Sequence, residues 1–328
     1  MNSAVVYVGV DVAKAHLDVA WAERSRRFAD GKSGWGALIK WIKQSALPVH
    51  LICEASGGYE RGLLDAAEQN AIKLSLVQAN RVRQYARAAG ILAKTDKVDA
   101  RVLCAFGSAM QPEPTLPLSV QQKQLRELET QRRHLSRMLV AEQNRLAQLN
   151  DKELQRLTRC LLASLKKQIA LIDARLAALI AQDQTLREKA QKLTAIAGVG
   201  RRTAVLLLAQ MPELGTLHRA QTAALAGLAP FNRDSGTLRG KRTIFGGRRA
   251  LRCGLYMAAL VAARHNLILR NFYQRLRNNG KPHKVALTAV MRKLILALNQ
   301  TLKPTACFAG TQDSYYSICE IVLSPRVA

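Results

Sequence analysis

Acidic residues are scarce in this chain, and that scarcity is the first guide to what it binds. The 328 residues include 23 aspartates and glutamates against 50 lysines and arginines, which gives a net charge of +27. Such an excess of positive charge indicates a polyanionic partner. A ribosomal or chromatin-type packing protein is the alternative, but such proteins are usually shorter and less apolar than a chain with 48% hydrophobic residues.

Metal-binding and membrane-spanning patterns are also missing. The six cysteines are widely separated without a CxxC pair, and the six histidines show no metal-ligand spacing. This argues against a zinc site and fits a reducing compartment. No segment reaches the about 20 apolar residues of a membrane-spanning helix, and we expect no signal peptide before the first strand. The sequence therefore predicts a cytoplasmic protein without a membrane partner.

Strands and helices alternate in the first part of the chain, which we expect to form an α/β domain over residues 1–115. Hydrophobic periodicity predicts strands and helices in turn. The expected strands are 6–10, 16–21, 49–53 and 73–77, and the expected helices are 34–44, 61–70 and 96–107. Three strands followed by alternating helices and strands are typical of an RNase-H-like (RuvC-like) fold.

Four carboxylates lie at particular positions of this predicted fold. Asp11 ends the first strand, Glu54 ends a later one, and Asp96 and Asp99 are three apart on one helix face. Hard cations such as Mg²⁺ prefer carboxylate and phosphate oxygens, and two ions about 4 Å apart serve phosphoryl transfer. We therefore predict a two-Mg²⁺ site. The alternative is that Asp96 caps its helix together with Thr95, and that Asp11 is a turn residue.

Basic side chains surround the acids in the sequence. Arg81, Arg83, Arg87 and Lys94 precede the helix that carries the aspartate pair. They would draw a phosphate backbone toward the acids. A solvated charged surface is the ordinary alternative for such residues.

Residues 116–192 are predicted to form a long helical connector. Leucine and isoleucine recur there with heptad spacing, and Asn150-Asp151 is the expected break. Two helices of this length favour an antiparallel hairpin or a coiled-coil dimer arm. Two ordinary packed helices explain the pattern equally well.

Residues 193–305 are predicted to form a second, helical domain, followed by a tail over 306–328 that has no assigned structure. The domain opens with a helix–hairpin–helix-like pattern around Gly198 and Gly200. These glycines allow a tight turn whose backbone N–H groups can meet a phosphate. A plain turn between helices is the equal alternative.

A basic block interrupts this helical domain and contains Ser235. Its predicted nucleic-acid-binding residues are Arg233, Arg239, Lys241, Arg242, Arg248 and Arg249. A hydroxyl among guanidinium groups is placed to attack a phosphodiester, because the cations stabilise the charge that builds up on phosphorus. The alternative is an Asp-Ser-Gly turn in which Ser235 only donates a hydrogen bond. No histidine base is near it in the sequence.

Together these motifs resemble the transposases of insertion sequences that pair a RuvC-like DEDD domain with a serine-bearing C-terminal transposase domain. That family includes bridge-RNA-guided recombinases and the related Piv-type invertases. The resemblance covers about residues 5 to 305. It is carried by VGVD, CEASGGYE, KTDKVDAR, AIAGVGRRTA, LAGLAPFNRDSGTLRGKR, RRALRCGLYMAAL and RLRNNGKPHKVAL.

The resemblance implies a role for each key residue. The four metal ligands of the family fall on Asp11, Glu54, Asp96 and Asp99, and its catalytic serine falls on Ser235. Glu60 is not the expected ligand, because the glutamate of the family precedes the small-Ser/Thr-Gly step.

The resemblance also implies an activity and partners. A phosphoserine intermediate would join donor and target DNA in the bacterial cytoplasm, with Mg²⁺ as the cofactor. A guide (bridge) RNA would pair with both DNAs, and the protein would act as a dimer or a dimer of dimers.

Three other activities remain open at this point. The first is a site-specific DNA invertase without guide RNA. The second is a RuvC-like hydrolytic junction nuclease that uses the acids alone, and the third is a nucleic-acid-binding protein without catalysis. Ser235 distinguishes the recombinases from the nuclease, and the order of the four acids argues against the binding protein.

Overall fold

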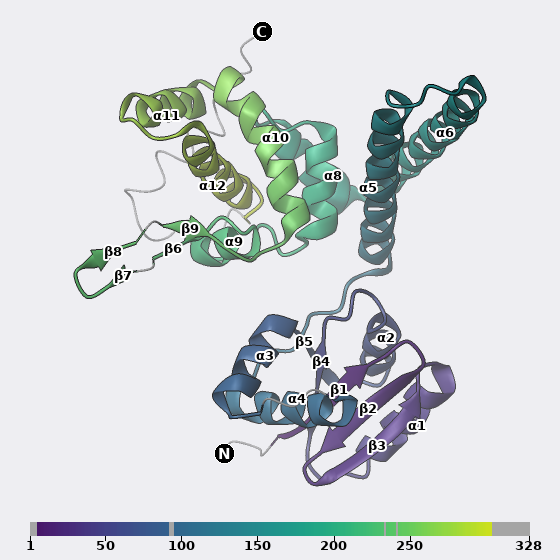
Figure 1. Cartoon of the computed structure of the whole chain (residues 1–328). Coiled ribbons are helices and arrows are strands. Elements are labelled where there is room, and N and C mark those ends of the chain that lie inside the picture. Colours follow the sequence, from purple (N-terminus) through teal and green to yellow (C-terminus); the bar gives the residue numbers. More distant parts are fainter. Residues whose placement is uncertain (1–4, 92–94, 233, 241, 304–328) are drawn as a thin grey trace. The chain divides into compact units, whose positions relative to one another are not determined.

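Pro117 marks the division of the chain into two units, residues 1–117 and 118–328, which we describe separately. The computed structural model describes residues 5–91, 95–232, 234–240 and 242–303 (Figure 1). Several predicted features lie outside this part of the chain. They are Lys94, Arg233, Lys241, the tail from residue 306, and the side chains of Asp96 and Arg239.

The first unit is built on a mixed sheet of five strands in the order β3-β2-β1-β4-β5. The strands are β1 (Val6–Val12), β2 (His16–Trp21), β3 (Arg24–Ala29), β4 (Val49–Glu54) and β5 (Lys73–Val77). β1 is antiparallel to β2 and parallel to β4, and β4 is parallel to β5. The four predicted strands are confirmed. β3 had no predicted position, because as an edge strand it buries only Phe28.

Helices cover both faces of this sheet. They are α1 (Lys32–Ile42), α2 (Arg61–Gln69), α3 (Ala79–Ala88) and α4 (Asp96–Met110). On one face, Leu38 and Leu63 from α1 and α2 pack on alternate residues of β1 and β2. On the other face, Phe106 of α4 and Val82 of α3 pack on Ile52. This mixed α/β arrangement is consistent with the predicted RNase-H-like domain.

Helix α4 lies directly on β1 because Gly9 has no side chain. A Cβ atom at Gly9 would overlap the carbonyl oxygen of Ala100 and lie 2.5 Å from the backbone nitrogen of Cys104. Closer to the other end of the strand, Gly107 lies against Tyr7 in the same way, with a Cβ that would be 3.0 Å from the ring. Helix α4 therefore runs antiparallel to β1, and its N-terminus reaches the carboxyl end of the strand.

We expect the substitution Gly9→Ala to lower the free energy of unfolding by about 3 kcal/mol, because the new methyl group must push α4 off the sheet. Urea denaturation followed by circular dichroism measures the change. Gly36→Ala in α1 is the matched control, because a Cβ atom there meets nothing within 4 Å. It should be neutral or stabilising. An unchanged midpoint for Gly9→Ala would contradict this account of the packing.

The second unit begins with the predicted helical hairpin. Helix α5 (Val120–Leu146) and helix α6 (Lys152–Gln182) are joined by residues 147–151, and the Asp151 side chain caps α6 by accepting from the Leu154 N–H at 2.9 Å. The predicted break at Asn150-Asp151 is confirmed. Leu125 and Leu176, at the base of the hairpin, belong to the core of the helices that follow. The base of the hairpin is thus continuous with the helical part of this unit.

The rest of the second unit, up to residue 303, is helical, as predicted, apart from short strands over 230–244. The helices are α7 (Gln184–Thr194), α8 (Arg201–Gln210), α9 (Arg219–Leu225), α10 (Arg249–His265), α11 (Leu267–Asn278) and α12 (His283–Thr301). Helix α12 packs against α9, α10 and α11, and its Leu294, Ile295 and Leu298 are fully buried. Among the described helices, none is long and apolar enough to cross a membrane.

Candidate active site

Two predicted metal ligands lie at the carboxyl ends of neighbouring parallel strands. Val10 of β1 is the partner of Cys53 in β4, so the next residues, Asp11 and Glu54, occupy adjacent positions. Each lies two residues after a position that faces α4, namely Gly9 and Ile52. Since side chains alternate along a strand, both carboxylates lie on the face of the sheet that α4 covers.

The other two predicted ligands lie in the first turn of α4, which approaches the same edge of the sheet. The Oγ1 atom of Thr95 accepts a hydrogen bond from the Val98 N–H at 3.3 Å and caps the helix. Thr95 is therefore the N-cap residue of α4, and the part that the alternative gave to Asp96 lies outside the described side chains. Ala100 contacts Gly9, so Asp99 lies near the end of β1 that carries Asp11.

Buried Cys53 precedes Glu54 in β4, and nearby acids affect its thiol. Burial raises the pKa of its thiol far above the usual range, and the negative charges of Glu60, Asp11 and Glu54 raise it further. The thiol stays protonated and unreactive at neutral pH. Cys53 packs in the core beneath α1 and α2, so its pKa reports the negative charge at this end of the sheet from the face opposite α4.

Glu60 has a different task from the other two acids. Its Oε2 atom accepts hydrogen bonds from the Ser56 hydroxyl at 2.7 Å, from the Gly58 N–H at 2.8 Å and from the Ser56 N–H at 3.2 Å. Burial alone would raise the pKa of Glu60, but these bonds hold it below its ordinary value. Glu60 thus fixes the loop that follows Glu54, which supports Glu54 as the metal ligand of this motif.

The chemistry of the donors fits Mg²⁺, since every candidate ligand offers carboxylate oxygen. Asp11 and Glu54 come from adjacent strands, and Asp99 comes from the helix that crosses them. Among the described side chains, no group of three or more histidines, cysteines, aspartates and glutamates is close enough to hold a metal. The side chain of Asp96, the fourth predicted ligand, lies outside that set.

Asp18 is a further acid at this site that the sequence analysis missed. It is the direct cross-strand partner of Asp11, and it is only 4% exposed. Arg27 of β3 donates to both of its carboxylate oxygens, from Nε at 3.0 Å and from Nη2 at 2.7 Å. His16 Nε2 lies 3.3 Å from the same carboxylate. The register of the hairpin formed by the first two strands, if worked out from the sequence, would have placed Asp18 opposite Asp11.

Three of the predicted basic residues near the acids lie on α3. Arg81 and Arg87 are exposed and Arg83 is half-buried. The Arg81 guanidinium lies 5.8 Å from the centroid of the Phe106 ring of α4. Helix α3 therefore carries positive charge alongside the helix that carries Asp99, where it can attract a phosphate backbone.

Ser235 lies on a short β-hairpin, where the sequence had predicted a loop. Strand β7 (Asp234–Ser235) pairs with β8 (Leu238–Arg239), and Gly236 has the positive φ of 54° that a two-residue hairpin turn favours. The Asp234 Oδ1 atom accepts from the Gly240 N–H at 3.1 Å. Strand β6 (Pro230–Phe231) pairs with β9 (Thr243–Ile244) nearer the helices. The hairpin projects from the helices of this unit, and Ser235 is exposed on it (Figure 1).

Arg248, one of the predicted nucleic-acid-binding residues, forms contacts within the fold. Its guanidinium donates to both oxygens of Glu213, at 2.7 and 2.9 Å, and to the carbonyl oxygen of Gln210 at 2.7 Å. Burial would raise the pKa of Glu213, but the bond with Arg248 lowers it below the ordinary value. Arg248 thus anchors the start of α10, and its contact with nucleic acid stays a prediction. Arg242 and Arg249 of the same block are exposed.

The two glycines of the predicted helix–hairpin–helix do different work. Gly198 has a φ of 103°, and a Cβ atom there would lie 2.5 Å from the Cβ of Ala262, so this glycine lets the turn pack on α10. Gly200 precedes α8 and has open space around it. Gly200 is exposed, as are Arg201 and Arg202 at the start of α8, and the phosphate contact at Gly200 stays a prediction.

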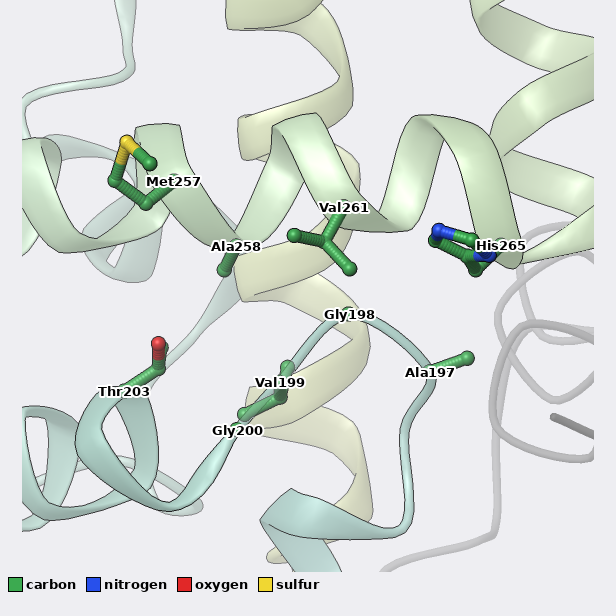
Figure 2. A pocket seen from close by; sticks show the side chains of 9 residues that line it. All are labelled: Ala197, Gly198, Val199, Gly200, Thr203, Met257, Ala258, Val261 and His265. Atoms are coloured by element: carbon green, nitrogen blue, oxygen red, sulfur yellow. The ribbon is translucent and has the colours of Figure 1, made fainter.

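A surface hollow of about 470 Å³ lies beside this turn. Figure 2 shows the turn around Gly198 on one side and Met257, Val261 and His265 of α10 on the other. Thr203 of α8 also lines it. The hollow is mostly apolar and adds contact surface next to the N-terminus of α8.

Comparison with known proteins identifies the class of enzyme as one that recombines DNA. Residues 8–152 match the DEDD domain of IS110 elements, described as a transposase, and residues 190–274 match the transposase IS116/IS110/IS902 family. The chain belongs to the IS110 family of transposases and recombinases.

Individual relatives extend over most of the chain. The pilin gene-inverting proteins of Moraxella bovis and Moraxella lacunata are each 30% identical over 300 residues, which is 88% of this chain and 93% of each relative. A 43.6 kDa protein of the insertion element IS110 from Streptomyces coelicolor is 36% identical over 114 residues, which is 34% of this chain and 28% of that protein.

Proposed function

We propose that this chain is the recombinase of an insertion sequence and that it joins donor and target DNA through a covalent phosphoserine link at Ser235. The observation that carries the proposal is the exposed position of Ser235 beside the turn of a hairpin, where a DNA strand can reach the hydroxyl. Membership of the IS110 family supports DNA as the substrate.

The proposed reaction exchanges one phosphodiester for another. The Oγ atom of Ser235 attacks a DNA phosphorus atom and loses its proton, the bond to a deoxyribose 3′ oxygen breaks, and that oxygen takes up a proton. A hydroxyl of the other DNA then attacks the phosphoserine and releases Ser235. Arg242 and Arg249 are exposed in the same block and would stabilise the charge on phosphorus. No external energy source is required.

Asp11, Glu54, Asp96 and Asp99 are the residues that would hold Mg²⁺. When bound, the ion would supply positive charge to the attacking and leaving oxygens of the phosphoryl group. The adjacent positions of Asp11 and Glu54, together with the antiparallel course of α4, support this assignment.

A guide RNA and a second copy of the chain complete the proposal. The net charge of +27 and the 5% aromatic content suit a protein that holds nucleic-acid backbones while an RNA reads the sequence. Leu154, Leu157 and Leu161 of α6 are 49, 53 and 43% exposed and share one side of the helix. This apolar stripe suits the proposed dimer or dimer of dimers, because a second copy of the hairpin would bury it.

Site-specific inversion without a guide RNA is the second candidate. It is favoured by the relatives that cover most of this chain, which are named as pilin gene-inverting proteins. The two candidates share the acids and the serine and differ in the RNA and in the geometry of the DNA product.

A recombination assay in a bacterial host tests the proposal. The chain is expressed with its flanking DNA, and long-read sequencing records new DNA junctions while the RNA that co-purifies is sequenced. Junctions together with one discrete RNA, complementary to the element ends and the insertion site, would support guided recombination. Inversion of a flanked segment without such an RNA would support the second candidate. Nicked or cut DNA without any new junction would contradict both and favour the hydrolytic nuclease.

A further inference from the structure

Aromatic side chains that face solvent are few, and two of them lie beside the hairpin that carries Ser235. Among the described residues, the exposed aromatic side chains are Tyr59, Phe231 and Phe245, which are 50, 49 and 66% exposed. The other described phenylalanines, tyrosines and tryptophans are buried or half-buried. Single exposed apolar residues are ordinary, but a contiguous group of them marks an interaction surface.

The two phenylalanines belong to one small sheet next to the Ser235 hairpin. Phe231 of β6 is the cross-strand partner of Thr243 in β9, and Phe245 follows two residues later. In Figure 1, β6 and β9 lie between the helices of the second unit and the β7–β8 hairpin. We call the exposed apolar residues of this sheet the aromatic patch, and its members are Pro230, Phe231, Ile244 and Phe245.

The segment that follows the aromatic patch is fixed to the helices of this unit. The carbonyl oxygen of Gly246 accepts a hydrogen bond from Arg252 Nη1 at 2.7 Å. The Arg248 N–H donates to the carbonyl oxygen of Leu225 at 2.8 Å. A ligand would therefore meet rings whose backbone is already ordered, which lowers the entropic cost of binding.

The charge around the aromatic patch selects the kind of partner. Residues 230–249 include six lysines and arginines against one acid, Asp234. Arg242 directly precedes β9 and Arg249 begins α10, and both are exposed. A single strand of nucleic acid brings flat base faces for the rings and phosphates for the cations. An apolar protein surface would match the rings alone and would cover the cations without neutralising them.

We propose that Phe231 and Phe245 form a stacking site for unpaired DNA bases next to the phosphate that Ser235 attacks. Four residues span at most about 14 Å, so the Phe231 backbone lies within that distance of the Ser235 backbone. This is the length of about four stacked nucleotides at about 3.4 Å each. The inference rests on the proposed function, because the occupant is the DNA strand that Ser235 joins. The rings hold this strand while its bases are unpaired during the exchange.

Fluorescence anisotropy of the full-length chain with a labelled single strand of oligodeoxythymidine tests the stacking site without any chemical step. Phe231→Ala and Phe245→Ala should each weaken binding about tenfold, because one stacked base is lost. The tyrosine variants keep a flat ring and should bind like the native chain, whereas Phe231→Leu keeps only the apolar character and should stay weak. The salt dependence of binding should not change, since no cation is removed.

Two controls separate stacking from other effects. Val285→Ala removes another exposed apolar side chain of the same unit, 54% exposed on α12, and should leave binding unchanged. The same thymidine strand annealed to its complement should bind the native chain and the alanine variants alike, because its bases are already paired. Circular dichroism shows whether each variant is folded.

Native affinity for the thymidine strand in both alanine variants, or native binding by Phe231→Leu, would overturn the inference. A loss of affinity for the matching uridine RNA alone would assign the patch to RNA, and smaller oligomers of the alanine variants without DNA would assign it to a second copy of the chain. Either result would also overturn it. Ser235→Ala should bind the thymidine strand normally. If that variant still joined DNA while the phenylalanine variants lost binding, the phosphoserine proposal would fail and the stacking site would stand.

Discussion

Replacement of Ser235 by alanine is expected to abolish DNA joining, with a loss of at least about 10³-fold in rate, because the proposed covalent link forms on the Ser235 hydroxyl. The fold should not change. Ser235 is exposed on its hairpin, and surface substitutions usually alter the free energy of unfolding by less than about 0.5 kcal/mol. Junction formation in the recombination assay and thermal unfolding of the purified variant measure the two effects.

Thr237→Ala is the matched control for this prediction. Thr237 carries another exposed hydroxyl in the same hairpin, in the turn after Gly236, and its loss should leave joining intact. The Ser235→Ala variant should also bind DNA with an unchanged salt dependence, since it keeps every cation. An alanine variant that still joins DNA would refute the phosphoserine mechanism. One that only nicks DNA in Mg²⁺ would favour the hydrolytic nuclease.

Asp11→Asn is expected to have a comparably large effect through the other unit of the chain. The neutral amide keeps the shape of the side chain but removes the charge that would bind Mg²⁺, so joining should fall by about 10³-fold.

Glu23→Gln serves as the control for Asp11→Asn. Glu23 is an exposed acid in the turn between β2 and β3 of the same sheet, so its neutralisation should alter neither joining nor Mn²⁺ binding. Loss of joining in Asp11→Asn with unchanged Mn²⁺ binding would show that Asp11 serves the reaction without holding the ion. Full activity of Asp11→Asn would remove the basis for a metal site at the carboxyl ends of β1 and β4.

The parts of the fold that follow a hydrophobic period could be predicted from the sequence. The valines of β1 alternate, and the leucines of α5 and α6 recur on one side, so these elements and the break at Asn150-Asp151 were found. β3 and α3 had no predicted positions for a common reason. β3 buries only Phe28, and α3 buries only Val82 and Ala86, so neither carries a clear periodic signal.

Prediction of the candidate site from the sequence has a similar limit. The order of the acids and the basic block pointed to the chemistry, but the sequence could not show which charges are used within the fold. Arg248 pairs with Glu213, 35 residues away, a contact that depends on tertiary packing. Asp18 became part of the site only through the register of β1 and β2. Gly198 and Gly200 look alike in sequence, and only the packing on Ala262 separates their tasks.

The most direct test of the central claim is to identify the residue that carries DNA during the reaction. The native chain is incubated with recombining DNA and Mg²⁺, denatured, digested with protease and nuclease, and examined by mass spectrometry. We predict a nucleotide-bearing phosphate on Ser235, formed by the native chain and not by Asp11→Asn. Recombinant junctions that form without any protein-linked DNA, or a link to a residue other than Ser235, would contradict the account.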